Sequence, residues 1–368
     1  MTPPPDPTDR PRLDHVDGLR AVAIFWVALY HYAYFWTPAG KGTNLLPYGD
    51  VVARTPLADV GYLGVYLFFI VSGFVIAMSL TRSKSIGQFA LNRVIRLWPA
   101  LIICGTITFA LTSFFGPDQL RRSPLEYLIS LTFVPPPHVG KLLGIGGLEW
   151  LDGAYWSLWT EVRFYFIAAV LYFSMRRHFI LLWTLFAFAS TGVHVMGSIA
   201  GGSWDALARL LFTAHQPFFT AGIALASLRF GHLTWPRWLL TFAIVQAFTF
   251  PALAVGGLTD HTAAGLILVF VLAVPVMLSP GPVPVLSSRA FATVGVASYA
   301  YYLLHQNAGI ALLQALHDQR TDVMIFIMIA TQIGLVLFSI GLTKWVEEPL
   351  RRALRRKRTP SSAQLRQA

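Results

Sequence analysis

The chain has 368 residues, of which 55% are hydrophobic and only 12% are charged, and its formal net charge is +11. Because soluble domains carry about 25% charged residues, this composition excludes an ordinary soluble globular protein. The basic residues lie at the ends of apolar runs and in the stretch "RRALRRKR" (residues 351–358), which is typical of cytoplasmic membrane flanks rather than of a nucleic-acid-binding surface. We therefore expect an all-α, polytopic integral membrane protein whose partners include membrane lipids and no nucleic acid.

The segments outside the apolar part of the chain are short. Residues 1–12 are rich in proline and have no apolar stretch ahead of a cleavage site, so we expect a disordered cytoplasmic tail rather than a signal peptide. Residues 13–350 are expected to form a single transmembrane domain, followed by a basic cytoplasmic tail over 351–368. The single cysteine, Cys104, lies in an apolar run, which excludes an internal disulfide and a cysteine-built metal site, and no metal is expected.

Apolar runs long enough to cross a membrane recur along the chain. A helix that crosses about 30 Å of hydrocarbon needs about 20 mostly apolar residues. Such runs lie at residues 17–36, 58–80, 94–115, 154–174, 179–200, 205–228, 236–256, 262–279, 292–316 and 323–346. A further run, 125–134, is shorter and is followed by three prolines, which stop a helix.

The charged flanks of these runs decide the topology. If residues 125–134 do not cross, most arginines and lysines fall on the same side as the N-terminus. If they do cross, the arginines from 176 to 237 and the basic tail fall on the outside, against the positive-inside tendency. We therefore predict about ten transmembrane helices with both termini in the cytoplasm. Residues 116–153 then form an outer loop with a short interfacial helix.

The second predicted span contains three glycines. They stand at positions 61, 64 and 73, within "GYLGVYLFFIVSGFVI". Small residues in a membrane helix usually allow two helix backbones to approach closely. We therefore predict tight helix packing along this span.

Two ionisable residues in different predicted spans lie at the same depth. At about 1.5 Å per residue, His31 lies about 21 Å above the inner end of its span, and Glu161 lies about 20 Å above the inner surface. A histidine and a carboxylate at one depth suit an acid–base site. His305 comes out near the same depth and His215 near the midplane. For these two histidines, a hydrogen bond to a neighbouring helix is the simpler interpretation.

Three arginines lie at the inner ends of the first and third spans. Arg20 opens the first span, and Arg93 and Arg96 stand three residues apart, on one face of a helix. Three converging guanidinium groups suit the binding of phosphates, because their forked donors match phosphate oxygens. The alternative is that these arginines only anchor the topology.

Six motifs occur in a fixed order along the chain. They are "DGLRAVAIFWVALYH", "GYLGVYLFFIVSGFVI", "NRVIRLWPA", "YWSLWTEVRFYF", "SYAYYLLHQ" and "VEEPLRR". This ordered set resembles the membrane acyltransferase-3 family, bacterial proteins that O-acylate sugars, envelope polymers and macrolides. The resemblance covers nearly the whole chain.

Individual residues of this chain match the family pattern. The family has an Arg or Lys separated by ten residues from a His, as Arg20 and His31 are here. The other matches are the paired arginines of the third span and the "WSLxxE" element: Arg93, Arg96, Trp156, Ser157, Leu158 and Glu161. Tyr66 stands where the family usually has Asp in "GVDLFF", which leaves the site near the second span open. Val162 stands where a second acid often follows the Glu, so Glu161 alone would carry the acidic role.

The resemblance implies a multi-pass O-acyltransferase of the inner (plasma) membrane. It would move an acyl group, expected to be acetyl, from cytoplasmic acyl-CoA to a hydroxyl of a sugar, envelope glycan, glycolipid or macrolide-like acceptor. His31 would be the general base or a transient acyl carrier, and Glu161 would assist by orienting the imidazole or stabilising its charged form. The residues that would hold the CoA phosphates are Arg20, Arg93 and Arg96. The candidates for contact with substrate are Trp156, Ser157, Tyr165 and His305.

Two other classes of function stay open on the sequence. A transporter or lipid flippase would use the intramembrane His, Glu and Arg side chains as a proton relay or gate, and it would need no CoA. A purely structural subunit would need them only as satisfied buried polar groups. Binding of acyl-CoA to the purified protein separates the acyltransferase from both.

Overall fold

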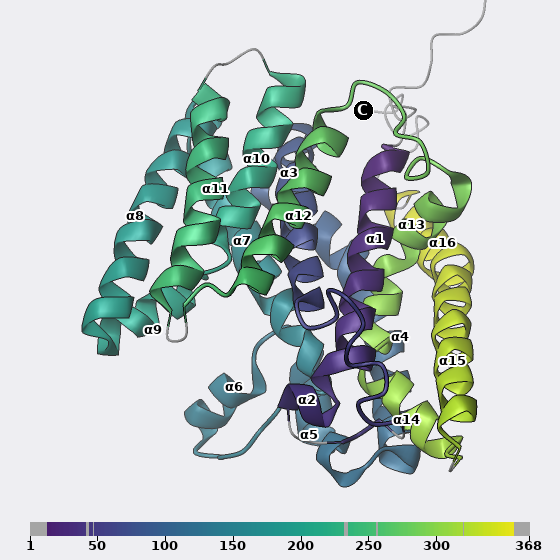
Figure 1. Cartoon of the computed structure of the whole chain (residues 1–368). Coiled ribbons are helices and arrows are strands. Elements are labelled where there is room, and N and C mark those ends of the chain that lie inside the picture. The colour runs from purple at the N-terminus through teal and green to yellow at the C-terminus, as the bar shows by residue number, and fades with distance from the viewer. Residues whose placement is uncertain are drawn as a thin grey trace, which may run out of the picture.

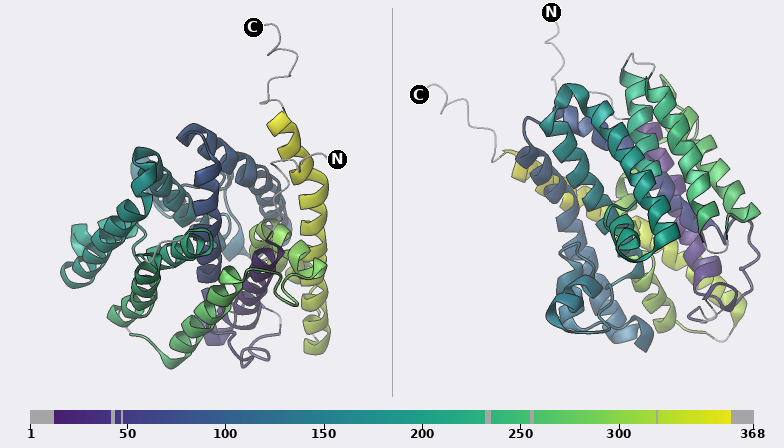
Figure 2. Two further views of the ribbon diagram at one scale, coloured as in Figure 1. Left: turned by 90° about the horizontal axis from the view of Figure 1, so that it is seen from above. Right: turned by 90° about the vertical axis from the view of Figure 1, so that its left-hand side faces the viewer.

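A computed structural model describes residues 13–356 except 42–43, 47, 232–234, 255–256 and 319. Within these residues every regular element is a helix, so the predicted all-α class is confirmed. The predicted tail over 1–12 and most of the predicted tail over 351–368 lie outside the described residues. The long helices stand side by side in one bundle, and the first turn of α1 and helix α16 lie at the same end of it (Figures 1 and 2).

The helices are numbered in chain order. The first eight are α1 Asp14–Tyr30, α2 Pro38–Lys41, α3 Gly64–Arg82, α4 Ile86–Phe115, α5 Pro124–Ser130, α6 Pro136–Leu143, α7 Trp156–Ser174 and α8 Phe179–Ala200. The others are α9 Gly202–Leu210, α10 Gln216–Phe230, α11 Trp235–Leu253, α12 Asp260–Leu278, α13 Arg289–Leu304, α14 Asn307–Ala315, α15 Thr321–Leu342 and α16 Glu348–Arg356. Two π-helical turns, η1 His31–Phe35 and η6 Thr343–Glu347, extend α1 and α15.

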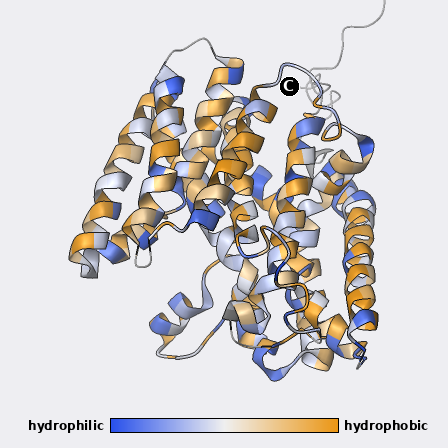
Figure 3. Ribbon diagram, in the orientation of Figure 1, coloured by the Kyte–Doolittle hydropathy of each residue, from blue (hydrophilic) through white to orange (hydrophobic). Residues whose placement is uncertain are grey.

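Among the described residues, five helical segments are long and apolar enough to cross a membrane. They are Gly61–Arg82, Ile86–Phe115, Arg176–Ala200, Asp260–Leu278 and Thr321–Ala353. Figure 3 shows apolar residues along α12 and α15 and hydrophilic residues in α6. The other five predicted runs fall on α1, α7, α10, α11 and α13, which are shorter or less apolar. A membrane protein is therefore supported, while ten crossings and cytoplasmic termini stay predictions.

Two predicted runs differ from the helices that form. The run 125–134 gives the seven-residue helix α5, in agreement with the short helix expected there, while its place at the membrane interface stays a prediction. The run 205–228 splits into α9 and α10, because Pro217 suits the first turn of a new helix rather than the interior of an old one. The run 292–316 breaks after α13, at His305 and Gln306, and resumes as α14.

Glycines bring three pairs of helices into backbone contact. A Cβ on Gly64 would lie 2.5 Å from the Ala23 carbonyl oxygen in α1, and a Cβ on Gly73 would lie 2.3 Å from the Phe219 carbonyl oxygen in α10. The tight packing predicted for this span is thus confirmed. The closest approach joins α13 to α1, where a Cβ on Gly295 would lie 1.7 Å from the backbone oxygen of Asp17.

We predict that Gly295→Ala destabilises the protein by about 1–3 kcal/mol, because the added methyl group must push α1 away from α13. The measurement is the midpoint of thermal unfolding in detergent, followed by intrinsic fluorescence. Gly192→Ala in α8 is the matched control, because no atom lies within 4 Å of the position of its Cβ. A midpoint for Gly295→Ala equal to that of the control would contradict the packing described.

Candidate functional site

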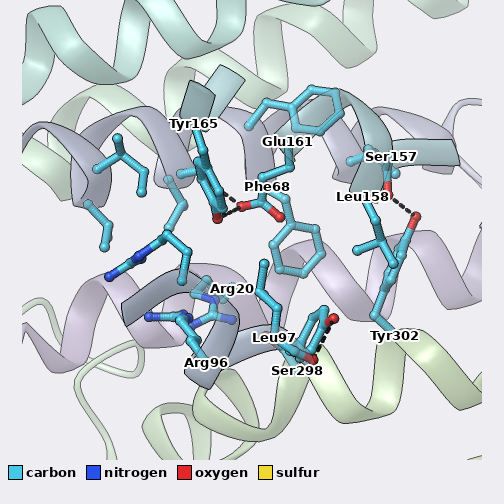
Figure 4. A pocket seen from close by; sticks show the side chains of 18 residues that line it. Arg20, Phe68, Arg96, Leu97, Ser157, Leu158, Glu161, Tyr165, Ser298 and Tyr302 are labelled. Carbon is cyan, nitrogen blue, oxygen red and sulfur yellow. Dashed lines mark hydrogen bonds between the residues drawn. The ribbon is translucent and has the colours of Figure 1, made fainter. Parts of the chain in front are cut away.

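A pocket opens between five helices of the bundle (Figure 4). It encloses about 750 Å³ of space outside protein atoms, and this volume includes its opening to solvent. Most of its lining is apolar. The polar residues that line it are Arg20 of α1, Ser72 of α3, Arg93 and Arg96 of α4, Ser157, Glu161 and Tyr165 of α7, and Ser298, Tyr299 and Tyr302 of α13. The pocket therefore combines a mainly apolar surface with ten polar side chains.

The structure brings the three predicted arginines to this one pocket. Arg93 and Arg96 come from successive positions on one face of α4, and Arg20 comes from the start of α1. The Nη1 atom of Arg20 lies 3.6 Å from Oδ1 of Asp17, and Nη2 of Arg93 donates to Oγ of Ser79 at 3.1 Å. These partners hold two of the guanidinium groups in place, and the pocket carries more positive than negative charge.

Glu161 lies in the same pocket as the arginines. Its Oε1 accepts hydrogen bonds from the hydroxyls of Ser72 and Tyr165. Its carboxylate also interacts electrostatically with Arg20 and Arg93. Figure 4 shows the Glu161 and Tyr165 side chains pointing toward each other. These contacts favour a place for Glu161 beside the arginines, while the direct partnership with His31 stays a prediction.

His31 lies against His305, the other histidine predicted at its depth. His31 is the first residue of the π-helical turn η1. Nδ1 of its ring lies 3.0 Å from the Val27 carbonyl oxygen. The Nε2 atom of His305 lies 3.2 Å from the same Nδ1, and the two rings are 5.0 Å apart. His305 is fully buried, and its Nδ1 lies 2.7 Å from the Tyr302 carbonyl oxygen. Depth counted along the sequence placed these two histidines on one level, and the structure shows that they meet.

Tyr302 connects the histidine pair to the pocket. Its ring lines the pocket and lies 5.4 Å from the ring of His305. Its hydroxyl group is 2.8 Å from Oγ of Ser157 and donates to the Ala154 carbonyl oxygen at 2.7 Å. The histidine pair and the pocket therefore share one side chain.

A buried aspartate fixes the chain just after His305. The Oδ2 atom of Asp152 accepts a hydrogen bond from the backbone N–H of Asn307 at 2.8 Å. Its Oδ1 atom accepts one from the backbone N–H of Ala154, also at 2.8 Å. Burial raises the pKa of Asp152 to about 6, so at neutral pH the carboxylate is still mainly ionised and both oxygens accept. Asp152 thus joins the turn just before α7 to the break between α13 and α14.

The four predicted substrate residues divide between three places. Ser157 and Tyr165 line the pocket, and His305 joins His31. Trp156 packs against His215 instead, with ring centres 5.0 Å apart. Tyr66, the position that departs from the family pattern, lies in the same aromatic cluster, 5.6 Å from His215.

Sequence reasoning missed four polar residues that line the pocket: Ser72, Ser298, Tyr299 and Tyr302. Helical spacing offered a signal, since Ser298 and Tyr302 are four residues apart and share a face of α13. Among the described residues, the buried Oγ of Ser298 and the buried Nε of Arg93 have no hydrogen-bond partner. Such unpaired groups suit a ligand that carries hydrogen-bonding atoms of its own. In the same residues no cluster of three or more His, Cys, Asp or Glu side chains could hold a metal ion.

Three curated proteins are similar to parts of this chain. Peptidoglycan O-acetyltransferase OatA of Listeria monocytogenes is 28% identical over 162 residues, 41% of this chain and 23% of that protein. The O-acetyl transferase of Shigella phage Sf6 is 26% identical over 151 residues, 39% of this chain and 43% of that protein. Nodulation protein 10 of Rhizobium leguminosarum is 27% identical over 205 residues, 52% of this chain and 50% of that protein. The chain thus spans half or less of the length of each relative.

No solved structure matches the chain. The family model described as an acyltransferase domain matches residues 13–344, which is nearly the whole chain. Two of the three relatives carry the name of an O-acetyltransferase. The chain therefore belongs to the acyltransferase-3 family, whose members are enzymes that transfer acyl groups.

Proposed function

We propose that the protein moves an acetyl group from cytoplasmic acetyl-CoA to a hydroxyl group of a glycan, glycolipid or macrolide-like acceptor, within the inner membrane. One observation carries the proposal: a pocket lined by three arginines shares Tyr302 with a buried pair of histidines. A relative named for peptidoglycan O-acetylation supports an envelope glycan as the acceptor. Membership of an acyl-transferring family favours this function over a transporter or flippase.

The pocket suits the donor. CoA carries phosphates at one end, and guanidinium groups bind phosphate oxygens through two parallel hydrogen bonds. Arg20, Arg93 and Arg96 would hold that end. The unpaired Oγ of Ser298 and Nε of Arg93 offer hydrogen bonds to further polar groups of the donor. The apolar wall would then surround the uncharged part of the molecule.

His31 would perform the proton transfer. As the acceptor hydroxyl oxygen attacks the thioester carbonyl carbon, the imidazole takes the hydroxyl proton. A new C–O bond forms, the C–S bond breaks, and the thiolate of CoA leaves and takes up the proton from His31. A route through an acetylated His31 balances equally and stays an alternative. Glu161 would act on the donor side, among the arginines.

We predict that His31→Ala lowers acetyl transfer by about 10²- to 10⁴-fold, because the reaction loses its proton acceptor. The protein should stay folded and should bind CoA as the wild type does. The assay follows radiolabelled acetyl transfer from acetyl-CoA to peptidoglycan fragments and macrolides by purified protein in lipid nanodiscs. His194→Ala in α8 is the matched control, because His194 packs on Phe250 and bonds Thr213, outside the pocket. More than half of wild-type turnover in His31→Ala would remove His31 from the reaction.

We predict that Arg96→Ala weakens CoA binding roughly 10- to 150-fold, since one charge-assisted contact is worth about 1.5–3 kcal/mol. Arg96→Lys should restore only part of the affinity, because an ammonium group cannot form the two-pronged contact. The differences should shrink at high salt. Isothermal titration calorimetry with CoA measures all three proteins.

Arg82→Ala is the control for the arginine experiment. Arg82 ends α3 and is exposed, outside the residues that line the pocket. Its loss should leave CoA affinity unchanged. Equal affinities for the wild type, Arg96→Ala and Arg96→Lys would show that Arg96 only anchors the topology.

We predict that Glu161→Gln strengthens CoA binding roughly 5- to 30-fold. Glutamine can still accept from Ser72 and Tyr165, but it removes a negative charge that opposes the phosphates, worth on the order of 1–2 kcal/mol in a partly polar pocket. Calorimetry with CoA measures the change, and Glu348→Gln on the exposed helix α16 controls for net charge. An unchanged affinity with strongly reduced turnover would instead assign Glu161 to His31.

A further inference from the structure

We infer that His305 is a positioning residue that holds His31 in the tautomer protonated on Nδ1, so that Nε2 of His31 is the nitrogen that accepts the proton. The inference rests on the proposed function for the role of His31 as a base. It assigns His305 a role behind the imidazole, in place of the substrate contact predicted from sequence.

The first step concerns the ring of His305. Its Nδ1 lies 2.7 Å from the Tyr302 carbonyl oxygen, and a carbonyl oxygen can only accept a hydrogen bond. Nδ1 of His305 therefore carries a hydrogen. In the neutral ring the lone pair is then on Nε2.

The second step concerns the ring of His31. Its Nδ1 faces two acceptors, the Val27 carbonyl oxygen at 3.0 Å and Nε2 of His305 at 3.2 Å. An unprotonated Nδ1 would place its lone pair against both of them. Nδ1 of His31 therefore carries the hydrogen, and in the neutral ring the basic lone pair is on Nε2.

The third step concerns what holds His305 itself. Its backbone oxygen accepts the hydroxyl of Tyr32, and Asp152 accepts the N–H of Asn307, two residues further on. The Tyr302 carbonyl oxygen fixes its ring from the other side. Because the residue is also fully buried, its ring has one orientation, with Nε2 toward His31.

The arrangement lets His31 take a proton without a buried anion beside it. Once Nε2 is protonated, the charge spreads over the ring, and Nδ1–H remains bonded to two acceptors. In hydrolase triads a carboxylate orients the imidazole from this side. A neutral histidine supplies an acceptor at the same nitrogen and avoids the cost of an extra charge in an apolar bundle.

The test reads the tautomer directly. Protein labelled with ¹⁵N-histidine in nanodiscs reports by NMR which ring nitrogen carries hydrogen, and His31→Gln assigns the His31 signals. We expect the Nδ1–H tautomer in the wild type. In His305→Phe, Nδ1 of His31 keeps the Val27 carbonyl oxygen but loses one of its two acceptors, so the share of the Nε2–H tautomer should rise. His305→Gln, whose amide oxygen can accept, should restore the wild-type share. A wild-type His31 protonated on Nε2, or a His31 spectrum unchanged in His305→Phe, would overturn the inference.

Kinetics give the second readout. His305→Phe should lower kcat for acetyl transfer about 10- to 100-fold with CoA affinity unchanged, and His305→Gln should recover part of kcat. His194→Phe is the control for placing a ring in a membrane helix and should change neither. A wild type that transfers no acetyl group would refute the proposed function alone, because the NMR experiment needs no activity. Wild-type kcat in His305→Phe would refute the positioning role.

Discussion

The contact between α1 and α13 is the constraint on which the site depends. Gly295 allows the two backbones to touch at one end, and at the other end Tyr32 donates to the backbone oxygen of His305. Between these points α1 contributes Arg20 and His31. The facing helix α13 contributes three of the residues that line the pocket, Ser298, Tyr299 and Tyr302, and its C-cap residue, His305, contacts the imidazole. A change in the spacing of this one helix pair would move the arginine pocket and the histidine pair at once.

The charges in the pocket illustrate how an apolar bundle tolerates ionised groups. A lone charge at such a depth is costly, so charged residues in membrane proteins are paired or face a cavity. Arg20 has Asp17 as its neighbour, Arg93 donates to Ser79, and Glu161 accepts two hydroxyls while it faces the arginines. One net positive charge remains, and it faces the pocket rather than lipid. That excess is what a phosphate-bearing donor would neutralise.

Three histidines of the bundle lie at helix interruptions. His31 begins a π-helical turn, His305 follows the last residue of α13, and His215 precedes the first residue of α10. Each interruption frees backbone groups that need new partners in an apolar environment. At the His305 corner these partners are Tyr32 and Asp152, so the groups that repair the helix break also orient the ring. The same hydrogen bonds therefore satisfy the backbone at the helix break and fix the position of His305.

The sequence alone determined the class of protein and its family. Composition indicated a helical membrane protein, ordered motifs indicated the family, and spacing selected Arg20, Arg93 and Arg96, which do meet in one pocket. These inferences succeed because hydropathy and helical periodicity are local properties of the chain.

Only the tertiary structure decided which deep residues meet. Depth counted along a straight helix placed His31, Glu161 and His305 on one level, but it carries no information on the direction in which each side chain points. In the structure His31 faces His305, and Glu161 faces Ser72, Tyr165 and the arginines. The difference arises from the lateral packing of helices and from the breaks at His31 and His305. Both depend on contacts between segments far apart in the chain, such as Asp152 with Asn307, which no local pattern encodes.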